Sequence, residues 1–192
     1  MPKLWNKAIE THRAQVRDAI LDAAASLVFE QGLRGVLMSQ IAERAGIGRA
    51  TLYKYFPDVE TILRAWHDRQ IAAHMSELVK ARDRAGVAGE RLVAVLTVLA
   101  DITRHTHSHD RDLVRFLHPD EQIVHAQQQF LEVLRDLIDD GIRVGDLRDD
   151  VAADDLARYC LHALGAAGEL SAEADTAQLV AVVMAGLGSN RQ

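Results

Sequence analysis

The feature that most constrains this chain is a pair of short helical segments separated by a glycine-rich turn. Apolar residues recur at intervals of three and four within residues 39–45 and again within 49–56, and Gly46-Ile47-Gly48 lies between the two segments. Glycine suits a residue with positive φ, and Ile47 is expected to fill the angle between the helices. Pro57 ends the second helix, because the residue before a proline is displaced from the helical region. Two short helices joined by a tight turn are typical of a helix-turn-helix motif.

The remaining sequence is also helical in pattern, and no segment alternates with the period of a strand. Glycines stand where most helices are expected to end, at Gly32, Gly46, Gly86, Gly141 and Gly145. A further helix is expected to begin after Asp58, whose carboxylate can accept from the amides of Glu60 or Thr61. The pattern therefore predicts an all-α fold, with the other helices over residues 11–31, 90–107, 121–140, 154–168 and 176–187.

The second short segment divides into a buried and an exposed face. Leu52 and Phe56 lie one turn apart and are expected to face inward, as are Ile41 and Ala45 of the first segment. The opposite face could enter the major groove of DNA, where Arg and Lys pair with guanine edges and hydroxyl groups hold phosphates. This exposed set comprises Arg49, Ala50, Thr51, Tyr53, Lys54 and Tyr55.

The charge distribution places any DNA contact in the first third of the chain. The net charge is −6, which by itself disfavours a polyanionic partner. Up to Trp66, however, there are nine Lys and Arg against seven Asp and Glu, and after it there are thirteen against twenty-one.

Composition excludes several other classes of protein. With 48% apolar and 26% charged residues, the chain is expected to fold into a globular protein. A single cysteine excludes an internal disulfide. The N-terminus has no signal-peptide pattern, and no window approaches the roughly 18 apolar residues of a membrane helix. We therefore expect a cytoplasmic protein without a membrane partner.

The stretch from Ile41 to Pro57, IAERAGIGRATLYKYFP, closely resembles the DNA-binding domain of TetR-family regulators, as does the preceding segment 20–32. The run Thr51-Leu52-Tyr53 followed by Tyr55-Phe56 is its most specific part. The resemblance covers residues 14–74. It implies an N-terminal three-helix DNA-binding domain over 14–74, with the helix-turn-helix at about 37–56. A helical-bundle domain for ligand binding and dimerisation would then occupy 75–192.

The resemblance also implies a function. The protein is expected to be a transcriptional regulator, a homodimer on a palindromic double-stranded operator, and most simply a repressor released by an unknown small-molecule effector. Arg49, Ala50 and Lys54 would read bases, whereas Thr51, Tyr53 and Tyr55 would hold phosphates or sugars. The effector would displace the helix that begins at Asp58. A helical protein-interaction module that merely reuses the motif is the alternative, disfavoured by the exposed cations and tyrosines.

Three residues depart from the family pattern. Leu37 stands where a capping Thr usually begins the first short helix, so that one cap and one phosphate contact are missing, and Ser39 is expected to substitute in part. Gly48 replaces a frequent Ser, and Val59 replaces a frequent Lys. Each lost phosphate contact should lower the salt dependence of DNA binding.

Residues 1–13 are expected to form a flexible basic arm. Lys3, Lys7, Arg13 and Arg17 give this end of the chain its charge. One interpretation is an arm that reaches into the minor groove, and the other is a frayed terminus.

Apolar stripes in the second domain suggest a ligand pocket and a dimer interface. A plain core explains the first set at least as well, and an intramolecular core is an open alternative for the second. The expected pocket residues are Trp66, Leu96, Leu99, Phe116, Phe130 and Leu134. The expected interface residues are Leu156, Leu161, Leu164, Gly165, Gly168, Leu179, Val182 and Val183.

Two further patterns suggest other chemistry only weakly. A histidine-rich stretch could bind a metal, but it lacks the defined ligand spacing of a zinc site. Cys160 and His162 are two residues apart on a helix and would point in different directions. We find no signature of a catalytic site, a cofactor or a metal, and expect no enzyme. The histidines concerned are His105, His107, His109, His118 and His125.

Overall fold

The computed structural model describes residues 2–32, 35–84, 86–107, 120–170 and 173–189. The chain divides into an N-terminal unit, Met1–Gln70, and a C-terminal unit, Ile71–Gln192. The division falls four residues before the domain boundary that the sequence suggested. It lies within one continuous helix, α4 (Val59–Arg82), so that this helix belongs to both units.

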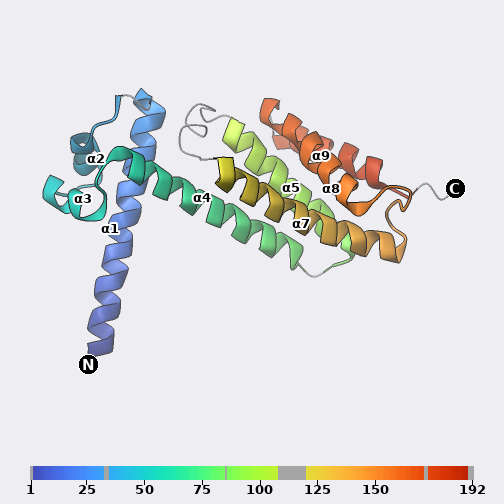
Figure 1. The fold of residues 1–192 in the computed structure, drawn as a ribbon, viewed down its shortest axis with the longest axis horizontal. Coiled ribbons are helices and arrows are strands. Elements are labelled where there is room, and N and C mark those ends of the chain that lie inside the picture. Colours follow the sequence, from blue (N-terminus) through green and yellow to red (C-terminus); the bar gives the residue numbers. More distant parts are fainter. Residues whose placement is uncertain (1, 33–34, 85, 108–119, 171–172, 190–192) are drawn as a thin grey trace. The chain divides into compact units, whose positions relative to one another are not determined.

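The N-terminal unit consists of α1 (Pro2–Gln31), α2 (Met38–Arg44), α3 (Arg49–Tyr55) and the first half of α4. Figure 1 shows α2 and α3 beside one half of α1, while the other half of α1 continues past them. Their shared core is formed by one face of α1 together with one or two apolar residues from each of α2, α3 and the first half of α4. Its fully buried side chains include Ile20, Leu21, Ala24, Ile41, Leu52, Ile62 and Leu63.

The expectation of a flexible arm over residues 1–13 is wrong, because α1 begins at Pro2 and is 30 residues long. Proline is well placed at the first position of a helix, where no backbone donor is required. No proline or glycine follows it before Gly32, where φ is 74° and the helix ends. Residues 2–13 are therefore helical, and they do not form the extended arm that the minor-groove interpretation required.

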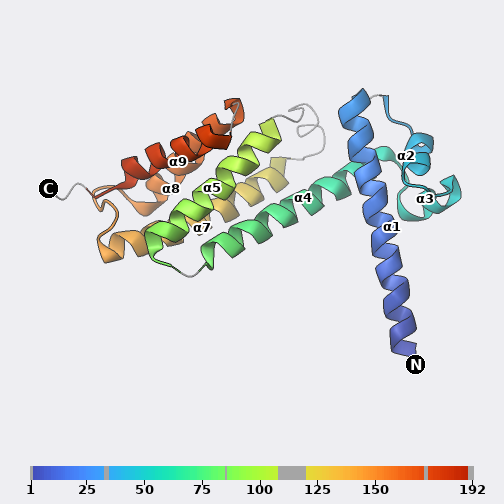
Figure 2. The ribbon, with the colours of Figure 1, turned by 180° about the vertical axis from the view of Figure 1, so that it is seen from behind.

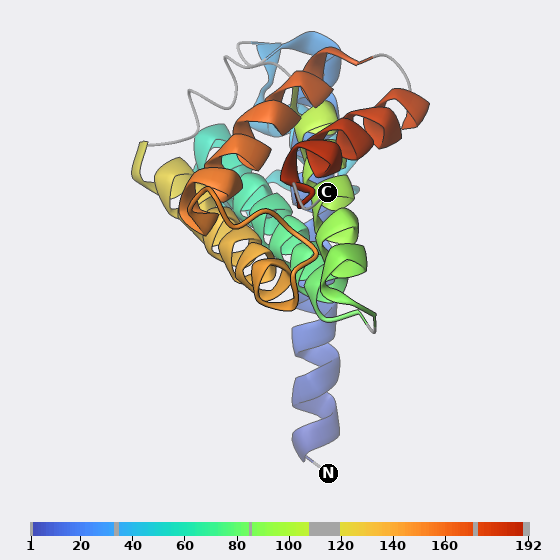
Figure 3. The ribbon, with the colours of Figure 1, turned by 90° about the vertical axis from the view of Figure 1, so that its right-hand side faces the viewer.

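The C-terminal unit is a helical bundle of the second half of α4, α5 (Ala88–His107), α7 (Asp120–Val144), α8 (Ala153–Leu164) and α9 (Glu173–Leu187). The helix expected over 154–168 ends earlier, and a 3-10 segment, Gly165–Glu169, follows α8. Helix α5 contacts α7, α8 and α9, as Figure 2 shows. Figure 3 looks onto α8 and α9, which pack against one another.

The central position expected for α5 is confirmed by its buried residues. Leu92, Val95, Leu96 and Ala100 are buried in one apolar cluster with side chains from every other helix of the unit. Burying each Leu side chain contributes about 1.5–3 kcal/mol relative to leaving it exposed. The described residues contain no strand beyond an isolated bridge between Leu147 and Gly188. The expected all-α fold is therefore confirmed for this part of the chain.

Of the five glycines expected to end helices, Gly141 has a different role. Gly32, Gly46, Gly86 and Gly145 have positive φ at or near helix ends, but Gly141 lies inside α7. A Cβ atom at position 141 would lie 2.6 Å from Cδ1 of Leu147. Gly141 is thus required for close packing rather than for chain reversal.

None of the described helices combines the length and the apolar character needed to cross a bilayer.

Candidate nucleic-acid interface

The turn between α2 and α3 is fixed by backbone hydrogen bonds. Gly46 has a φ of 68°, and its N–H donates to the carbonyl oxygen of Glu43 at 3.1 Å. The N–H of Ile47 donates to the carbonyl oxygen of Ala42 at 3.0 Å. These two bonds form a Schellman motif, which requires a left-handed residue at position 46. The tight turn predicted from the glycines is confirmed.

The start of α2 is capped by a residue that the sequence reasoning did not single out. Leu37 occupies the N-cap position and has no side-chain acceptor, as expected. The side-chain Oε1 of Gln40 accepts from the backbone N–H of Leu37 at 2.8 Å, which is one half of a capping box. Ser39, the expected partial substitute, is half-buried in the first turn, and the side chain at the N-cap itself makes no capping hydrogen bond. Gln40 therefore compensates in part for the missing Thr.

Helix α3 is held in place by its inward-facing residues. Leu52 is fully buried and Phe56 is 4% exposed, which confirms their expected positions. The carbonyl oxygen of Gly48 accepts from the N–H groups of Thr51 at 2.9 Å and Leu52 at 3.0 Å. The guanidinium carbon of Arg17 on α1 lies 5.6 Å from the centre of the Phe56 ring, within the range of a cation–π contact. Contacts from α1 thus help to fix the end of α3.

The outer face of α3 carries the side chains expected to meet DNA. Arg49, Ala50, Tyr53 and Lys54 are exposed, Tyr53 by 56%, whereas Thr51 and Tyr55 are only half-exposed. Within the described residues neither Arg49 nor Lys54 makes an ion pair. Two cations without an ion pair and a phenol are therefore exposed on the two turns of α3.

Arginine–carboxylate pairs fasten the motif and α4 to α1, and no sequence pattern predicted them. Arg44 of α2 donates from Nη2 to Oε2 of Glu30 at 2.8 Å, and a second bond joins Nη1 to Oε1. The bond from Arg44 holds the pKa of Glu30 below its ordinary value. Arg69 of α4 contacts both Asp18 and Asp22 on α1. The partners are 14 to 51 positions apart, so that local spacing carried no signal.

The start of α4 agrees with the expectation. The N–H of Thr61 donates to Oδ1 of Asp58 at 2.8 Å, and this bond is the main cause that lowers the pKa of Asp58. Glu60 in the first turn pairs with Arg64. The helix end is thereby capped and its dipole is matched by negative charge.

Neither of the two hollows found among the described residues is lined by an expected ligand-pocket residue. Trp66 lies in the N-terminal unit with its ring centre 5.8 Å from that of Phe29. Leu96, Leu99 and Leu134 are buried in the core of the C-terminal unit, and Phe130 packs against that core. Phe116 lies outside the described residues. The stripes on α5 and α7 are therefore packed core, as the simpler interpretation of the pattern held.

The expected dimer-interface residues divide into two groups. Leu156, Leu164 and Val183 are at most 5% exposed within this chain, so that they have almost no surface to offer a partner. Their assignment to an interface is corrected to core. Val182 is 65% exposed, and the remaining four have exposed or half-exposed positions: Leu161, Gly165, Gly168 and Leu179.

The described structure gives no support for metal binding by the histidine-rich stretch or for a reactive pair of Cys160 and His162. Nδ1 of His105 lies 2.7 Å from the carbonyl oxygen of Asp101. Among the residues with described side chains no group of three His, Cys, Asp or Glu could hold a metal, and His109 and His118 lie outside the described residues. Cys160 is fully buried, and burial raises its pKa to about 12, whereas His162 is exposed.

Comparison with known proteins agrees with the geometry. Residues 20–66 match the model of a family described as bacterial regulatory proteins, tetR family. An HTH-type transcriptional regulator of Mycobacterium tuberculosis is 31% identical over 97 residues, which are 50% of this chain and 49% of that protein. The chain therefore matches about half the length of this relative.

Two further comparisons extend over most of the chain. The HTH-type transcriptional repressor KstR2 of Rhodococcus jostii is 25% identical over 90% of this chain and 91% of its own length. The transcriptional regulator FadR of Bacillus subtilis, solved in complex with stearoyl-CoA, has a TM-score of 0.65 and 18% identity, with 88% of this chain and 98% of that chain covered. The second likeness shows a shared fold. Residues 20–66, which include the helix-turn-helix of α2 and α3, therefore carry the domain characteristic of the tetR family of bacterial regulatory proteins.

Proposed function

We propose that this protein is a transcriptional regulator that binds a palindromic operator as a homodimer through α3. The observation that carries the proposal is the exposed face of α3, on which Arg49, Tyr53 and Lys54 project from a helix anchored by Leu52 and Phe56. An exposed helix of this kind fits the major groove, where the donor and acceptor pattern of each base pair is distinct.

The side chains divide naturally by their chemistry. Arg49 and Lys54 carry donors that suit guanine, and Ala50 is small enough to meet a thymine methyl group. The hydroxyl groups of Thr51, Tyr53 and Tyr55 suit phosphate oxygens, which position the helix without reading sequence. Ser39 at the start of α2 is a further phosphate contact in this arrangement.

Dimerisation uses the surfaces of α8 and α9 that remain exposed. Val182 supports this assignment, because an aliphatic side chain that is 65% exposed gains from burial against a partner. Tyr159, which the sequence reasoning did not select, is 44% exposed on the neighbouring helix. A two-fold dimer would place its recognition helices in half-sites about 34–36 Å apart or a multiple of that distance.

We assign repression rather than activation, with release of the operator when an effector binds. The name of the R. jostii relative supports repression, and the B. subtilis regulator supports a small-molecule ligand for this fold. Helix α4 belongs to both units, so that an effector in the C-terminal unit could change the setting of α3. The coupling must be reciprocal, so that operator DNA lowers effector affinity by the same factor. Such a regulator acts on chromosomal DNA in the cytoplasm and needs no catalytic residue.

The test is selection from a pool of random duplex DNA by the purified protein, followed by sequencing. We expect enrichment of a palindrome by the parent protein and by an Arg135→Ala control, whose side chain lies on α7. The Arg49→Ala, Tyr53→Ala double variant should enrich no sequence. Absence of enrichment by the parent protein over a range of salt concentrations would refute the proposal.

A further inference from the structure

The second half of α4 and the first half of α5 border an open hollow of about 630 Å³ on the surface of the C-terminal unit. We propose that this hollow, here called the α4–α5 groove, binds a small amphipathic anion such as a medium-chain carboxylate. Its volume falls within the roughly 300–1,000 Å³ of small-molecule sites. None of the residues expected to form a pocket lines it.

The walls of the groove are apolar. Ala81 of α4 faces Val93, Ala94 and Val98 of α5. Val93 is 39% exposed although it lies on the helix at the centre of the bundle. The hydroxyl group of Thr97 donates to the carbonyl oxygen of Val93 at 2.8 Å. The walls therefore favour an apolar body over a polar one.

A second hollow of about 230 Å³ shares Arg84, Glu90 and Ala94 with the groove. Arg91 lines this smaller hollow. Its Nη2 lies 3.4 Å from Oδ2 of Asp140, and its Nε is buried without a hydrogen-bond partner in the described structure. A buried guanidinium nitrogen without an acceptor favours the arrival of one. Arg84 and Arg91 together present two forked donors, the geometry that suits a carboxylate.

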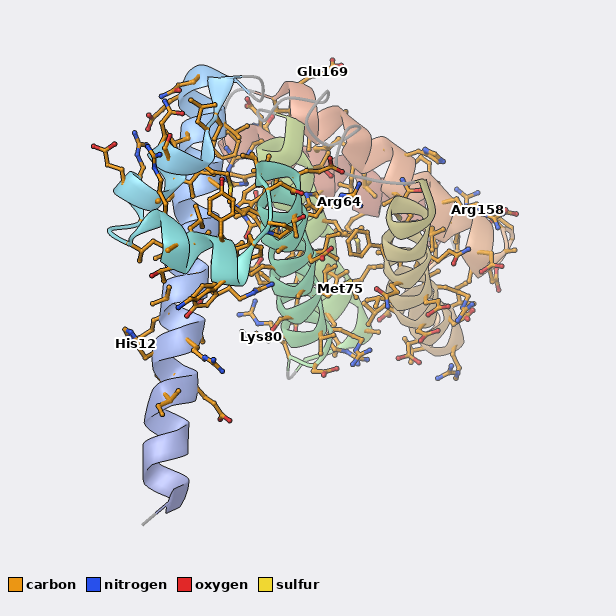
Figure 4. All side chains as sticks on the ribbon, turned by 60° about the vertical axis from the view of Figure 1, so that its left-hand side comes forward. His12, Arg64, Met75, Lys80, Arg158 and Glu169 are labelled. Atoms are coloured by element: carbon orange, nitrogen blue, oxygen red, sulfur yellow. The ribbon has the colours of Figure 1, made fainter. Side chains whose placement is uncertain are left out.

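Two cations on the groove are available to an anion. Lys80 and Arg84 line the groove and form no ion pair within the described residues, whereas Arg91 is paired with Asp140. In the whole chain after Trp66 acidic residues outnumber basic ones by twenty-one to thirteen, so that unpaired cations are unusual in this unit. Unpaired cations at a hollow attract anions. Lys80 is labelled near the end of α4 in Figure 4.

The position of Glu90 keeps the anionic end accessible. Its Oε2 lies over Gly86, only 2.5 Å from the place of a Cβ atom at that residue. Within the described residues Glu90 forms no ion pair with either arginine of the smaller hollow. Arg84 therefore keeps its charge uncompensated, while Arg91 is paired with Asp140 through Nη2 only.

The arrangement fixes the direction of the ligand. The carboxylate would lie at Arg84 and Arg91, and the alkyl chain would run along α5 from Ala94 towards Val98. Residues 90–98 span about 12 Å at the helical rise of about 1.5 Å per residue, which matches a medium-length chain. The site follows from the groove alone, and only its identification with the effector rests on the proposed function.

The test is calorimetric titration of the full chain with decanoate, in the absence of DNA. We expect saturable binding at one site per chain. Decan-1-ol and decyltrimethylammonium should bind at least about tenfold more weakly, since each lost charged contact of this kind corresponds to about a factor of ten. Acetate, which has the head group alone, should not bind measurably.

Matched variants locate the site. Arg84→Glu and Val93→Asp should each weaken decanoate binding by at least about tenfold. Arg135→Glu on α7 and Val79→Asp on α4 are the controls, and Val79 is exposed to nearly the same extent as Val93, 37% against 39%. The controls should bind like the parent protein. Circular dichroism establishes that each variant is folded.

Three results would overturn the proposal: no binding of decanoate, equal binding of the alcohol or the cation, or equal weakening by the control variants. Each would leave operator selection unaffected, because that experiment uses no ligand. If decanoate binds but does not release a selected operator, the groove is a ligand site and its occupant is not the effector. Conversely, a protein that selects no operator would still be expected to bind decanoate.

Discussion

Arg69 on α4 donates from Nη1 to Oδ1 of Asp18 on α1 at 3.1 Å. Its Nη2 meets Asp22 one turn further along the same helix. A single guanidinium group thus joins the first half of α4 to two successive turns of α1. The Arg69 side chain is 30% exposed, whereas those of Asp18 and Asp22 are 54% and 68% exposed, so that the clamp is only partly shielded from solvent.

Arg69→Ala should lower the free energy of unfolding of the N-terminal unit by about 1 kcal/mol, near the upper end for exposed pairs. Arg69→Lys should recover only part of the loss, because an ammonium group cannot reproduce the two-pronged geometry. Urea unfolding followed by Trp fluorescence measures both effects. Arg82→Ala, which removes a pair only with the adjacent Asp83, should change stability much less. Equal losses in the two alanine variants would contradict the clamp.

The capping of α2 can be tested by removing the side chain of Gln40 and, separately, by adding a capping side chain at Leu37. Gln40→Ala should destabilise α2 by roughly 0.5–1 kcal/mol, because the N–H of Leu37 loses its acceptor. Leu37→Thr should stabilise the protein by about 1 kcal/mol through a side-chain cap. Thermal unfolding of these variants provides the comparison, with Gln128→Ala on α7 as a control. A neutral result for Leu37→Thr would mean that the α2 N-terminus is already fully satisfied.

Local features of the candidate interface could be predicted from the sequence because their causes are local. The left-handed Gly46, the buried pair Leu52 and Phe56, and the cap at Asp58 each depend on neighbours within four residues. The helix limits of α2 and α3 follow from the same signals. For such features, residue spacing is sufficient.

Other features could not be predicted from the sequence. Some depend on contacts between segments far apart in the chain, and others depend on whether an apolar helix face forms a core or lines a pocket. The Arg69 clamp spans 51 positions, and nothing near Asp18 indicates it. Leu96 and Leu134 face the core because α5 and α7 pack together, and periodicity alone cannot distinguish a core from a pocket wall. The prediction of a flexible arm was wrong because positive charge at residues 3–17 does not prevent a helix, and this segment contains no proline or glycine that would interrupt one.

The cap at Asp58 should make stability depend on pH. The bond from Thr61 lowers the pKa of Asp58, so that the folded state binds the proton less tightly than the unfolded state. The stabilisation is complete above the unfolded pKa of about 3.9 and is lost as pH falls through the lower folded pKa. Asp58→Ala should therefore be less stable than the parent protein at neutral pH, and the difference should shrink in acid. A difference that stays constant with pH would show that the carboxylate charge does not contribute.

Arg49 and Tyr53 should affect operator binding in different ways. If Arg49 reads a base, Arg49→Ala should cost about 1–3 kcal/mol and relax the sequence preference at one position of each half-site. If Tyr53 holds a phosphate, Tyr53→Phe should weaken binding to all sequences alike. Gel-shift titrations on the selected operator and on single-base variants, at several salt concentrations, distinguish these outcomes. A uniform loss for Arg49→Ala would reassign that residue to the DNA backbone.

Cys160 should be inert in the folded protein. It is the sole cysteine of the chain, it is fully buried, and burial raises its pKa to about 12. Since the thiolate is the reactive form, a disulfide reagent at neutral pH should modify Cys160 only as fast as the C-terminal unit opens. The rate should rise steeply in urea at concentrations that unfold the bundle. Rapid modification of the native protein would show instead that α8 opens locally.

Substitution of Cys160 separates its packing from its chemistry. Cys160→Ser places a hydroxyl group in the apolar core and should cost about 1–3 kcal/mol, because the hydroxyl leaves water without a designed partner. Cys160→Ala leaves a small cavity but buries no polar group, so it should be the milder change of the two. Operator binding by the folded Cys160→Ala variant should equal that of the parent protein. A loss of operator affinity in that variant, with stability retained, would assign the thiol a role beyond that of a small apolar side chain.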